Sequence, residues 1–292
     1  MDVHNVQKTG NMHYLYLPTA WCKKYGINNN TKITVISNND ESLTLYPLVV
    51  EKKKKKLNLI INETDPEIIH KLIVASYINP AHSFTITLNK ELQLKTILQQ
   101  KKLLGVELVE VSGKTISCES SISIQHPEAL LKTMVVKIKN MLFIMQKKNF
   151  YLELVERYEE EIDKAKLYID KAILSFFTSS EKYSLEPIEM HYISLISKDL
   201  EKMVDHLLLI DTTDKEFLRR IYAIIQNYHD ILDKKILFNY ETAIAFIKNV
   251  QQIKEIKVRK IPDYDKKIIK QYLVNISEVL IDWAITKEIE KK

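Results

Sequence analysis

The sequence predicts a multidomain α+β protein, because the pattern of apolar residues changes twice along the chain. Residues 1–50 alternate short strand-like and helix-like pieces, residues 57–126 alternate longer strand and helix patterns, and residues 127–292 carry helical periodicity alone. A chain of 292 residues is long enough to bury more than one hydrophobic core. Hydrophobic residues make up 46% and charged residues 28%, which is typical of a folded globular protein. We therefore expect three consecutive domains.

The first region, residues 1–50, predicts a small β-α-β-β domain. Strand-like runs flank a turn at Gly10 and Asn11, two residue types that accept a positive φ. In PTAWCKKYG, Pro18 suits the first turn of a helix and Gly26 suits its C-cap. The apolar residues that follow predict a closing hairpin. A domain this small buries little apolar surface by itself, so we expect it to form a homodimer.

The second region, residues 57–126, predicts a small β-α-β-α-β-β domain. Its first strand is LNLIIN, and Asp65 and Pro66 then supply the N-cap and first position of a helix. SFTITLN alternates as a strand does, and LQLKTILQQKKLLG predicts a second helix that ends at Gly105. A hairpin around SGK closes the region. This order favours a small sheet covered by two helices.

The third region predicts an all-α domain of six helices. They are expected at about 127–148, 150–178, 187–211, 214–238, 240–257 and 264–290. Prolines at positions 127, 187 and 262 fall at or near three of the starts. Because the connections are short, consecutive helices should be antiparallel, most simply as two three-helix bundles placed end to end.

Several functional classes are excluded or disfavoured. The four glycines, at positions 10, 26, 105 and 113, form neither a GxGxxG nor a GxxxxGK[ST] phosphate loop. Cys22 and Cys118 are too few for a disulfide framework. Because no motif assembles a nucleophile, a base and oxyanion donors, we do not expect an enzyme. No apolar run approaches the roughly 18 residues of a membrane span, and no signal peptide is evident, so we expect a cytoplasmic protein without membrane insertion.

Carboxylates recur at the spacing E-x-x-x-D in the helical region. The three pairs are Glu159 with Asp163, Glu201 with Asp205, and Glu278 with Asp282. Residues four apart are neighbours on a helix, so an ionised pair costs roughly 0.2–0.5 kcal/mol. On a helical wheel each pair lies just off one edge of the apolar stripe, on the same side, so pairs on adjacent helices can converge. For the third pair this requires five residues to face inward: Leu273, Leu280, Ile281, Ala284 and Ile285.

Two interpretations of these pairs remain open. Clustered carboxylate oxygens suit hard divalent cations such as Mg²⁺ or Mn²⁺, or iron with carboxylate ligands, and a cation would remove the repulsion. The alternative is a solvated helix edge on which the carboxylates pair with nearby lysines. The available lysines are Lys164, Lys166, Lys198 and Lys202.

The first region resembles a known DNA-binding domain. VQKTG, followed by YLYLPTAWCKKYGI and TKITV, is similar to the swapped-hairpin SpoVT/AbrB family, although Asn11 stands where a second glycine is usual. Members pair two chains, interleave their strands and bind DNA through basic residues of the dimer surface. The resemblance implies phosphate contacts from Lys8, Lys23, Lys24 and Lys32. The alternative is a solvated basic face, and the run KKKKK at 52–56 could add non-specific contacts.

The helical region resembles the PhoU family over residues 128–292. Members contain two repeats of a three-helix bundle and carry E/D-x-x-x-D on their helices, as in EEEID, LEKMVDH and SEVLID here. They regulate phosphate uptake between a phosphate transporter and a two-component sensor kinase, and some bind multinuclear metal clusters through these carboxylates. The fifth helix has Glu241 but Ala245 four residues later, so the resemblance favours a metal site on the first bundle.

As an ordered whole the chain resembles the archaeal type of PhoU-domain protein. This implies a homodimeric, DNA-binding regulator of phosphate uptake or phosphate-responsive transcription, whose helical region senses phosphate status, a metal or a partner protein. The alternative is an adaptor that does not bind DNA and instead contacts a phosphate transporter ATPase or a sensor kinase.

Overall fold

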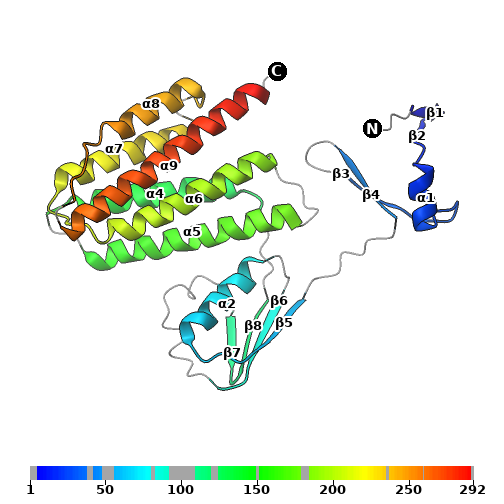
Figure 1. Ribbon diagram of the computed structural model, residues 1–292, viewed down its shortest axis with the longest axis horizontal. Helices are drawn as coiled ribbons and strands as arrows, with labels where there is room; N and C mark the ends of the chain where they lie inside the picture. Colours follow the sequence, from blue (N-terminus) through cyan, green and yellow to red (C-terminus); the bar gives the residue numbers. More distant parts are fainter. Residues whose placement is uncertain are drawn as a thin grey trace. The chain divides into compact units, whose positions relative to one another are not determined.

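The computed structural model is a mixed α+β protein (Figure 1). It describes residues 5–37, 42–47, 56–79, 83–91, 109–119, 124–148, 151–178, 184–234, 237–258 and 260–290. The chain divides into two compact units, Met1–Lys53 and Lys54–Lys292. The predicted second and third regions therefore lie within one unit. Among the described residues, no helix is both long enough and apolar enough to span a membrane.

The described residues of the N-terminal unit form two hairpins joined by a short helix. Strands β1 (Gln7–Thr9) and β2 (Met12–Tyr14) form the first, helix α1 (Thr19–Tyr25) follows, and β3 (Thr34–Ser37) and β4 (Leu43–Tyr46) form the second. The order is thus β-β-α-β-β, one strand more than the predicted domain. As expected, Gly26 is the C-cap of α1, with a left-handed φ of 62°.

The first turn explains why Asn11 can replace a glycine. Gly10 has a φ of 61°, whereas Asn11 is not among the positive-φ residues of the described chain. A two-residue hairpin loop with a positive φ only at its first central position has the φ pattern of a type II′ turn, which requires glycine there and not at the second position. A second glycine is therefore unnecessary.

The second unit begins with a four-stranded sheet. Its strands are β5 (Lys56–Ile61), β6 (Ser83–Leu88), β7 (Val109–Ser112) and β8 (Thr115–Glu119), in the order β5-β6-β8-β7. β5 and β6 are parallel, as expected for strands joined by helix α2 (Pro66–Ile78), and the other pairs are antiparallel. Asp65 caps α2 as predicted, because its side chain accepts a hydrogen bond from the Glu67 N–H at 2.8 Å. The second predicted helix, which ends at Gly105, lies outside the described residues.

Alternating residues of the sheet form a small core with α2. Phe84, Ile86 and Ile116 face Ile69 and Ile73 of the helix, and all five are buried. The next residue along each strand points to the opposite face, as the two-residue period of a strand requires. The sheet therefore has one apolar face, and α2 packs against it.

In the described part of the second unit, six helices follow the sheet, as the sequence predicts. They are α4 (Pro127–Met145), α5 (Leu152–Thr178), α6 (Pro187–Leu207), α7 (Lys215–Leu232), α8 (Tyr240–Gln251) and α9 (Ile261–Glu290). Consecutive helices run antiparallel (Figure 1). Several starts are fixed by caps: Asp214 accepts from the Phe217 N–H, and Asn239 and Thr242 form a capping box.

The two halves of the helical region lie side by side rather than end to end. Helix α6 packs along α9 and α4 packs along α7, and one continuous core includes residues of all six helices. Polar contacts join α6 to α9 as well, since Tyr192 Oη lies 2.8 Å from Thr286 Oγ1. The predicted end-to-end arrangement differs because the buried residues of α6 form a stripe wide enough to contact α5 and α9 together.

Helix α5 also joins the helical region to the α/β layer. Lys171 of α5 is only 5% exposed, and its Nζ donates to the Tyr77 carbonyl of α2 at 3.0 Å. The same ammonium lies 3.9 Å from the centre of the Tyr77 ring. Leu167 and Tyr168 pack against the core of the sheet. One face of α5 is therefore shared between the two layers.

Candidate metal centre

Three of the predicted carboxylates converge between α5 and α6. One ligand oxygen from each of Glu159, Asp163 and Asp205 can be chosen so that all three lie within 4.8 Å of one another. Ile162 and Ile169 of α5 and Val204 of α6 are buried in the common core. Because the carboxylates lie beside these apolar positions, packing of the two helices brings them together. All three side chains are half-buried.

The spacing of the three oxygens fits a cation. Ligand oxygens lie about 2.0–2.6 Å from Mg²⁺ or Ca²⁺, so two on opposite sides of the ion are separated by about 4–5 Å. The set consists of oxygen donors alone, which favours a hard cation over one that prefers sulfur or imidazole. Three carboxylates leave coordination positions for water or for a further ligand. The arrangement could therefore hold a metal ion.

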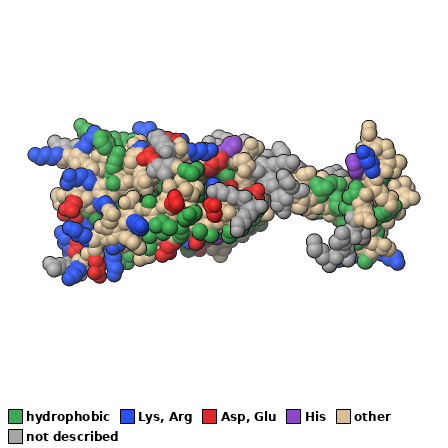
Figure 2. Space-filling model, turned by 90° about the horizontal axis from the view of Figure 1, so that it is seen from above, with side chains coloured by type: hydrophobic (Ala, Val, Ile, Leu, Met, Phe, Trp, Pro, Cys, Tyr) green, Lys and Arg blue, Asp and Glu red, His purple; other side chains and the backbone are tan. Residues whose placement is uncertain are grey.

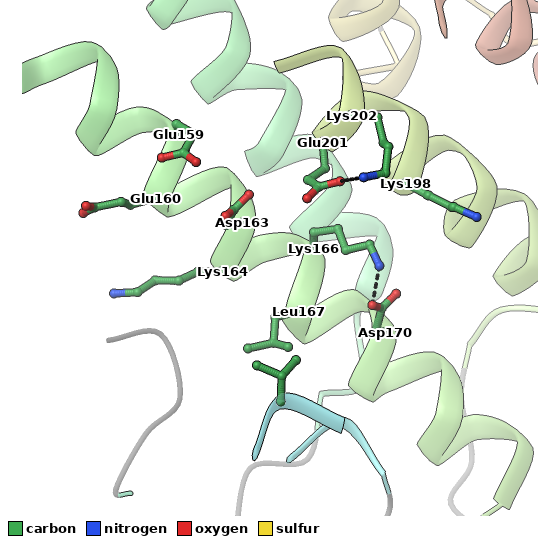
Figure 3. Close-up of a pocket in the computed structure, with 11 residues that line it drawn as sticks. Glu159, Glu160, Asp163, Lys164, Lys166, Leu167, Asp170, Lys198, Glu201 and Lys202 are labelled. Atoms are coloured by element: carbon green, nitrogen blue, oxygen red, sulfur yellow. Dashed lines mark hydrogen bonds and ion pairs between the residues drawn. The ribbon is translucent and has the colours of Figure 1, made fainter. Parts of the chain in front are cut away.

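A cavity of about 370 Å³ adjoins two of these carboxylates, Glu159 and Asp163 (Figure 3). Glu159 and Asp163 border it from α5, and Glu201 borders it from α6. In Figure 3 Leu167 points from α5 toward helix α2, whose Val74 also lines the cavity. The cavity thus lies where the α/β layer meets two helices of the bundle.

Lysines surround the carboxylates, and some of them already have partners. Lys166 forms a short ion pair with Asp170, and Lys202 Nζ lies 3.8 Å from Glu201. Lys164 and Lys198 also line the cavity. The solvated-edge interpretation therefore holds for the pairs at Asp170 and Glu201. Glu159, Asp163 and Asp205 differ from these pairs in that one oxygen of each lies within 4.8 Å of the other two.

The other predicted ligands lie elsewhere. Glu201 borders the cavity but is not part of the group of three, and Glu278 and Asp282 are exposed on α9. The helical wheel placed Ile285 inward, whereas it is 47% exposed and Ile276 and Trp283 are buried in its place. The buried face of α9 is thus rotated relative to the predicted one, and the third pair points to solvent.

Two further features were not predicted from the sequence. Asp265 of α9 is only 3% exposed, and its Oδ1 accepts a hydrogen bond of 2.8 Å from His206 Nδ1 of α6. Its Oδ2 is buried without a partner among the described residues. Val74 was not predicted to line the cavity because it belongs to a different region of the sequence. Neither contact follows from spacing within one helix.

The candidate DNA contacts are all at the surface of the N-terminal unit. The exposed residues are Lys8 on β1, Lys23 and Lys24 in the last turn of α1, and Lys32 before β3. Lys24 Nζ lies 5.3 Å from the centre of the Tyr25 ring. Of the KKKKK run, residues 52–55 lie outside the described chain, and Lys56 is the first residue of β5.

Comparison with known proteins adds no relative to these observations. No family model, curated protein or solved structure matches the chain. The interpretation of the chain therefore depends on its own residues and on their geometry.

Proposed function

We propose that the chain is a homodimeric, cation-dependent regulator that binds DNA through its N-terminal unit. The observation that carries this proposal is the convergence of Glu159, Asp163 and Asp205 within 4.8 Å. A bound divalent cation, Mg²⁺ or Mn²⁺ by donor type, or iron, offsets their repulsion. Occupancy of the site then changes the stability of the α5–α6 pair, and this is the physical basis of sensing.

Dimerisation follows from the lack of a core in the N-terminal unit. None of its described residues, 5–37 and 42–47, is buried. The apolar side chains that remain exposed include Val6, Met12, Leu15, Tyr16, Val35 and Leu43. A folded domain needs to bury such residues, and a second copy of the same unit supplies a matching apolar surface.

DNA binding is supported by the exposed lysines of the same unit. Lys8, Lys23, Lys24 and Lys32 offer ammonium groups to phosphates, and the resemblance to the SpoVT/AbrB family gives them a precedent. The resemblance of the helical region to the PhoU family favours phosphate uptake as the regulated process. Phosphate status, a metal ion or a partner protein is then the signal.

Duplex binding over a range of salt concentrations tests the DNA proposal. Affinity should fall steeply between low and moderate salt, because each phosphate contact releases a counterion. Lys23→Glu/Lys24→Glu should abolish binding, whereas Lys147→Glu/Lys148→Glu, an exposed lysine pair of the helical region, should leave it within about twofold. An absence of duplex affinity at low salt for the unaltered protein would rule out this function.

The second candidate is an adaptor that contacts a phosphate transporter ATPase or a sensor kinase. One contact in the N-terminal unit favours it. Tyr16 Oη donates to Gln7 Oε1 at 3.1 Å, so a polar side chain beside Lys8 is already engaged within the unit. This candidate predicts that the unaltered protein binds a cation but does not bind duplex DNA.

A further inference from the structure

Three connections meet at one end of the helical region, which we call the turn end. It comprises the links between α4 and α5, α6 and α7, and α8 and α9, on the left in Figure 1. Lys215 Nζ donates to the carbonyls of Met145 and Lys147 at 2.9 and 3.1 Å, which joins the first link to the second. Lys266 pairs with Asp214, which joins the second to the third. Hydrogen bonds and an ion pair therefore hold the three links of the turn end together as one surface.

Large apolar side chains project from the three connections and from the first turns of α5 and α9. Ile261 is 81% exposed and Tyr151 is 80% exposed. Among the described residues, the most exposed of these side chains are Tyr151, Leu152, Leu209, Val258, Ile261 and Tyr264. Single exposed apolar residues are normal on soluble proteins. A group of them on adjacent turns instead marks an interaction surface.

Lysines surround these apolar side chains. Figure 2 shows Lys and Arg side chains gathered at the same end, on the left, with some carboxylates between them. The exposed lysines are Lys147, Lys148, Lys254, Lys257, Lys260 and Lys267.

Most carboxylates of the turn end are engaged within the protein, whereas Glu255 in the link between α8 and α9 is exposed. Glu153, Glu216 and Asp263 occupy first turns of helices, where the helix dipole offsets their charge. Asp214 is paired with Lys266, and Asp211 accepts hydrogen bonds from the backbone and side chain of Thr213. The charge that this end offers to a partner is therefore positive.

We propose that the turn end docks on an anionic lipid surface. Lysines attract acidic headgroups, and exposed Ile, Leu and Tyr side chains insert at the boundary between headgroups and acyl chains. Nucleic acid would satisfy the lysines but not the aliphatic tips, since a phosphate backbone offers them no apolar contact. Binding is peripheral, because the insertion involves only residues of the connections and of the first turns of α5 and α9.

Co-sedimentation of the full chain with lipid vesicles tests this proposal. Vesicles of phosphatidylcholine alone are compared with vesicles in which about a third of the lipid is phosphatidylglycerol, and binding to the anionic vesicles should be several-fold stronger. Leu209→Asp/Ile261→Asp removes two inserted side chains and should weaken that binding about tenfold or more. Both positions are exposed, so folding should be retained and is checked by circular dichroism.

A matched control separates the turn end from other basic segments. Ile289→Asp alters the last turn of the same helix as Ile261, at the opposite end, where the side chain is 68% exposed. It should bind the anionic vesicles as the unaltered protein does. Equal binding of Leu209→Asp/Ile261→Asp and Ile289→Asp would overturn the proposal, because the lysines of the N-terminal unit would then explain the attraction. A loss of duplex binding instead of vesicle binding in Lys147→Glu/Lys148→Glu would also overturn it, in favour of nucleic acid.

Discussion

Asp163 of α5 and Asp205 of α6 have carboxylate oxygens within 4.8 Å of each other, although the two residues lie on different helices. Packing of the buried stripes of α5 and α6 holds them there. Apolar burial at these positions, at about 25 cal/mol per Å², exceeds the repulsion between partly solvated carboxylates. We propose that a bound cation offsets the electrostatic cost that remains.

The first prediction concerns this cost in the absence of divalent cations. In the presence of a chelator, Asp163→Asn should raise the free energy of unfolding by roughly 0.5–1 kcal/mol, because two like-charge contacts are removed. Asp282→Asn, an exposed position on α9, should have no effect. Urea unfolding measures both variants. With Mn²⁺ added the unaltered protein should become the more stable one, and a destabilised Asp163→Asn in chelator would contradict the prediction.

The second prediction concerns the hydrogen bond between His206 and Asp265. His206→Ala leaves a buried carboxylate whose second oxygen already lacks a partner among the described residues, so it should cost roughly 2–3 kcal/mol. A double-mutant cycle with Asp265→Ala should give a coupling energy of at least about 1 kcal/mol. Lys202→Ala, an exposed substitution one turn earlier, is the control. Additive effects of the two substitutions would show that the pair is not coupled.

The third prediction concerns acid stability through Asp214. Burial raises the pKa of this carboxyl, but the Lys266 ammonium and the Phe217 N–H outweigh burial, so the pKa lies below its usual value of 3.8. A lowered pKa stabilises the folded state above pH 3.8, and this contribution is lost as the pH falls through the folded-state value. Asp214→Asn keeps an N-cap acceptor but loses the charge. It should cost about 0.5–1 kcal/mol at neutral pH, after allowance for solvent screening, and nothing once the carboxyl is protonated.

Urea unfolding at a series of pH values tests this difference. Asp282→Asn should show no such change with pH, because its side chain is exposed. A cost of Asp214→Asn that grows as the pH falls would have the wrong sign.

The fourth prediction concerns the link between α2 and α5. Lys171→Met keeps the length of the side chain but removes the donor to the Tyr77 carbonyl. A hydrogen bond from a charged group is worth about 1.5–3 kcal/mol, so amides of residues 66–78 should exchange at least about tenfold faster with solvent. Amides of α6 should be unchanged and serve as the internal control. Uniform acceleration in both helices would mean that Lys171 stabilises the whole unit instead.

The helices and their ends could be predicted from sequence because their causes are local. The N-cap at Asp65, the C-cap at Gly26 and the start of α4 at Pro127 each depend on residues within one turn. The side-by-side packing could not be predicted in this way. It depends on which neighbours cover the wide buried face of α6, and one helix does not contain that information.

The candidate site could be predicted only in part, because it also depends on how the helices pack. The spacing of Glu159 and Asp163 correctly identified a face of α5 that carries candidate ligands. Glu278 and Asp282 have the same spacing, but both side chains are exposed to solvent. The difference is the rotation of α9, which buries Trp283 with its Nε1 donating to Glu189 of α6 at 3.4 Å. That tertiary contact decides which of the equivalent pairs can converge.

Direct measurement of bound cation tests the central claim. Elemental analysis and calorimetric titration with Mn²⁺ are applied to the unaltered protein, to Asp163→Asn/Asp205→Asn and to Glu278→Gln/Asp282→Asn. The two double variants each remove two carboxylate charges, but only the first removes converging ones. We expect Mn²⁺ binding by the unaltered protein and by Glu278→Gln/Asp282→Asn, and its loss in Asp163→Asn/Asp205→Asn. Absence of bound cation in the unaltered protein, or equal binding by all three proteins, would contradict the account.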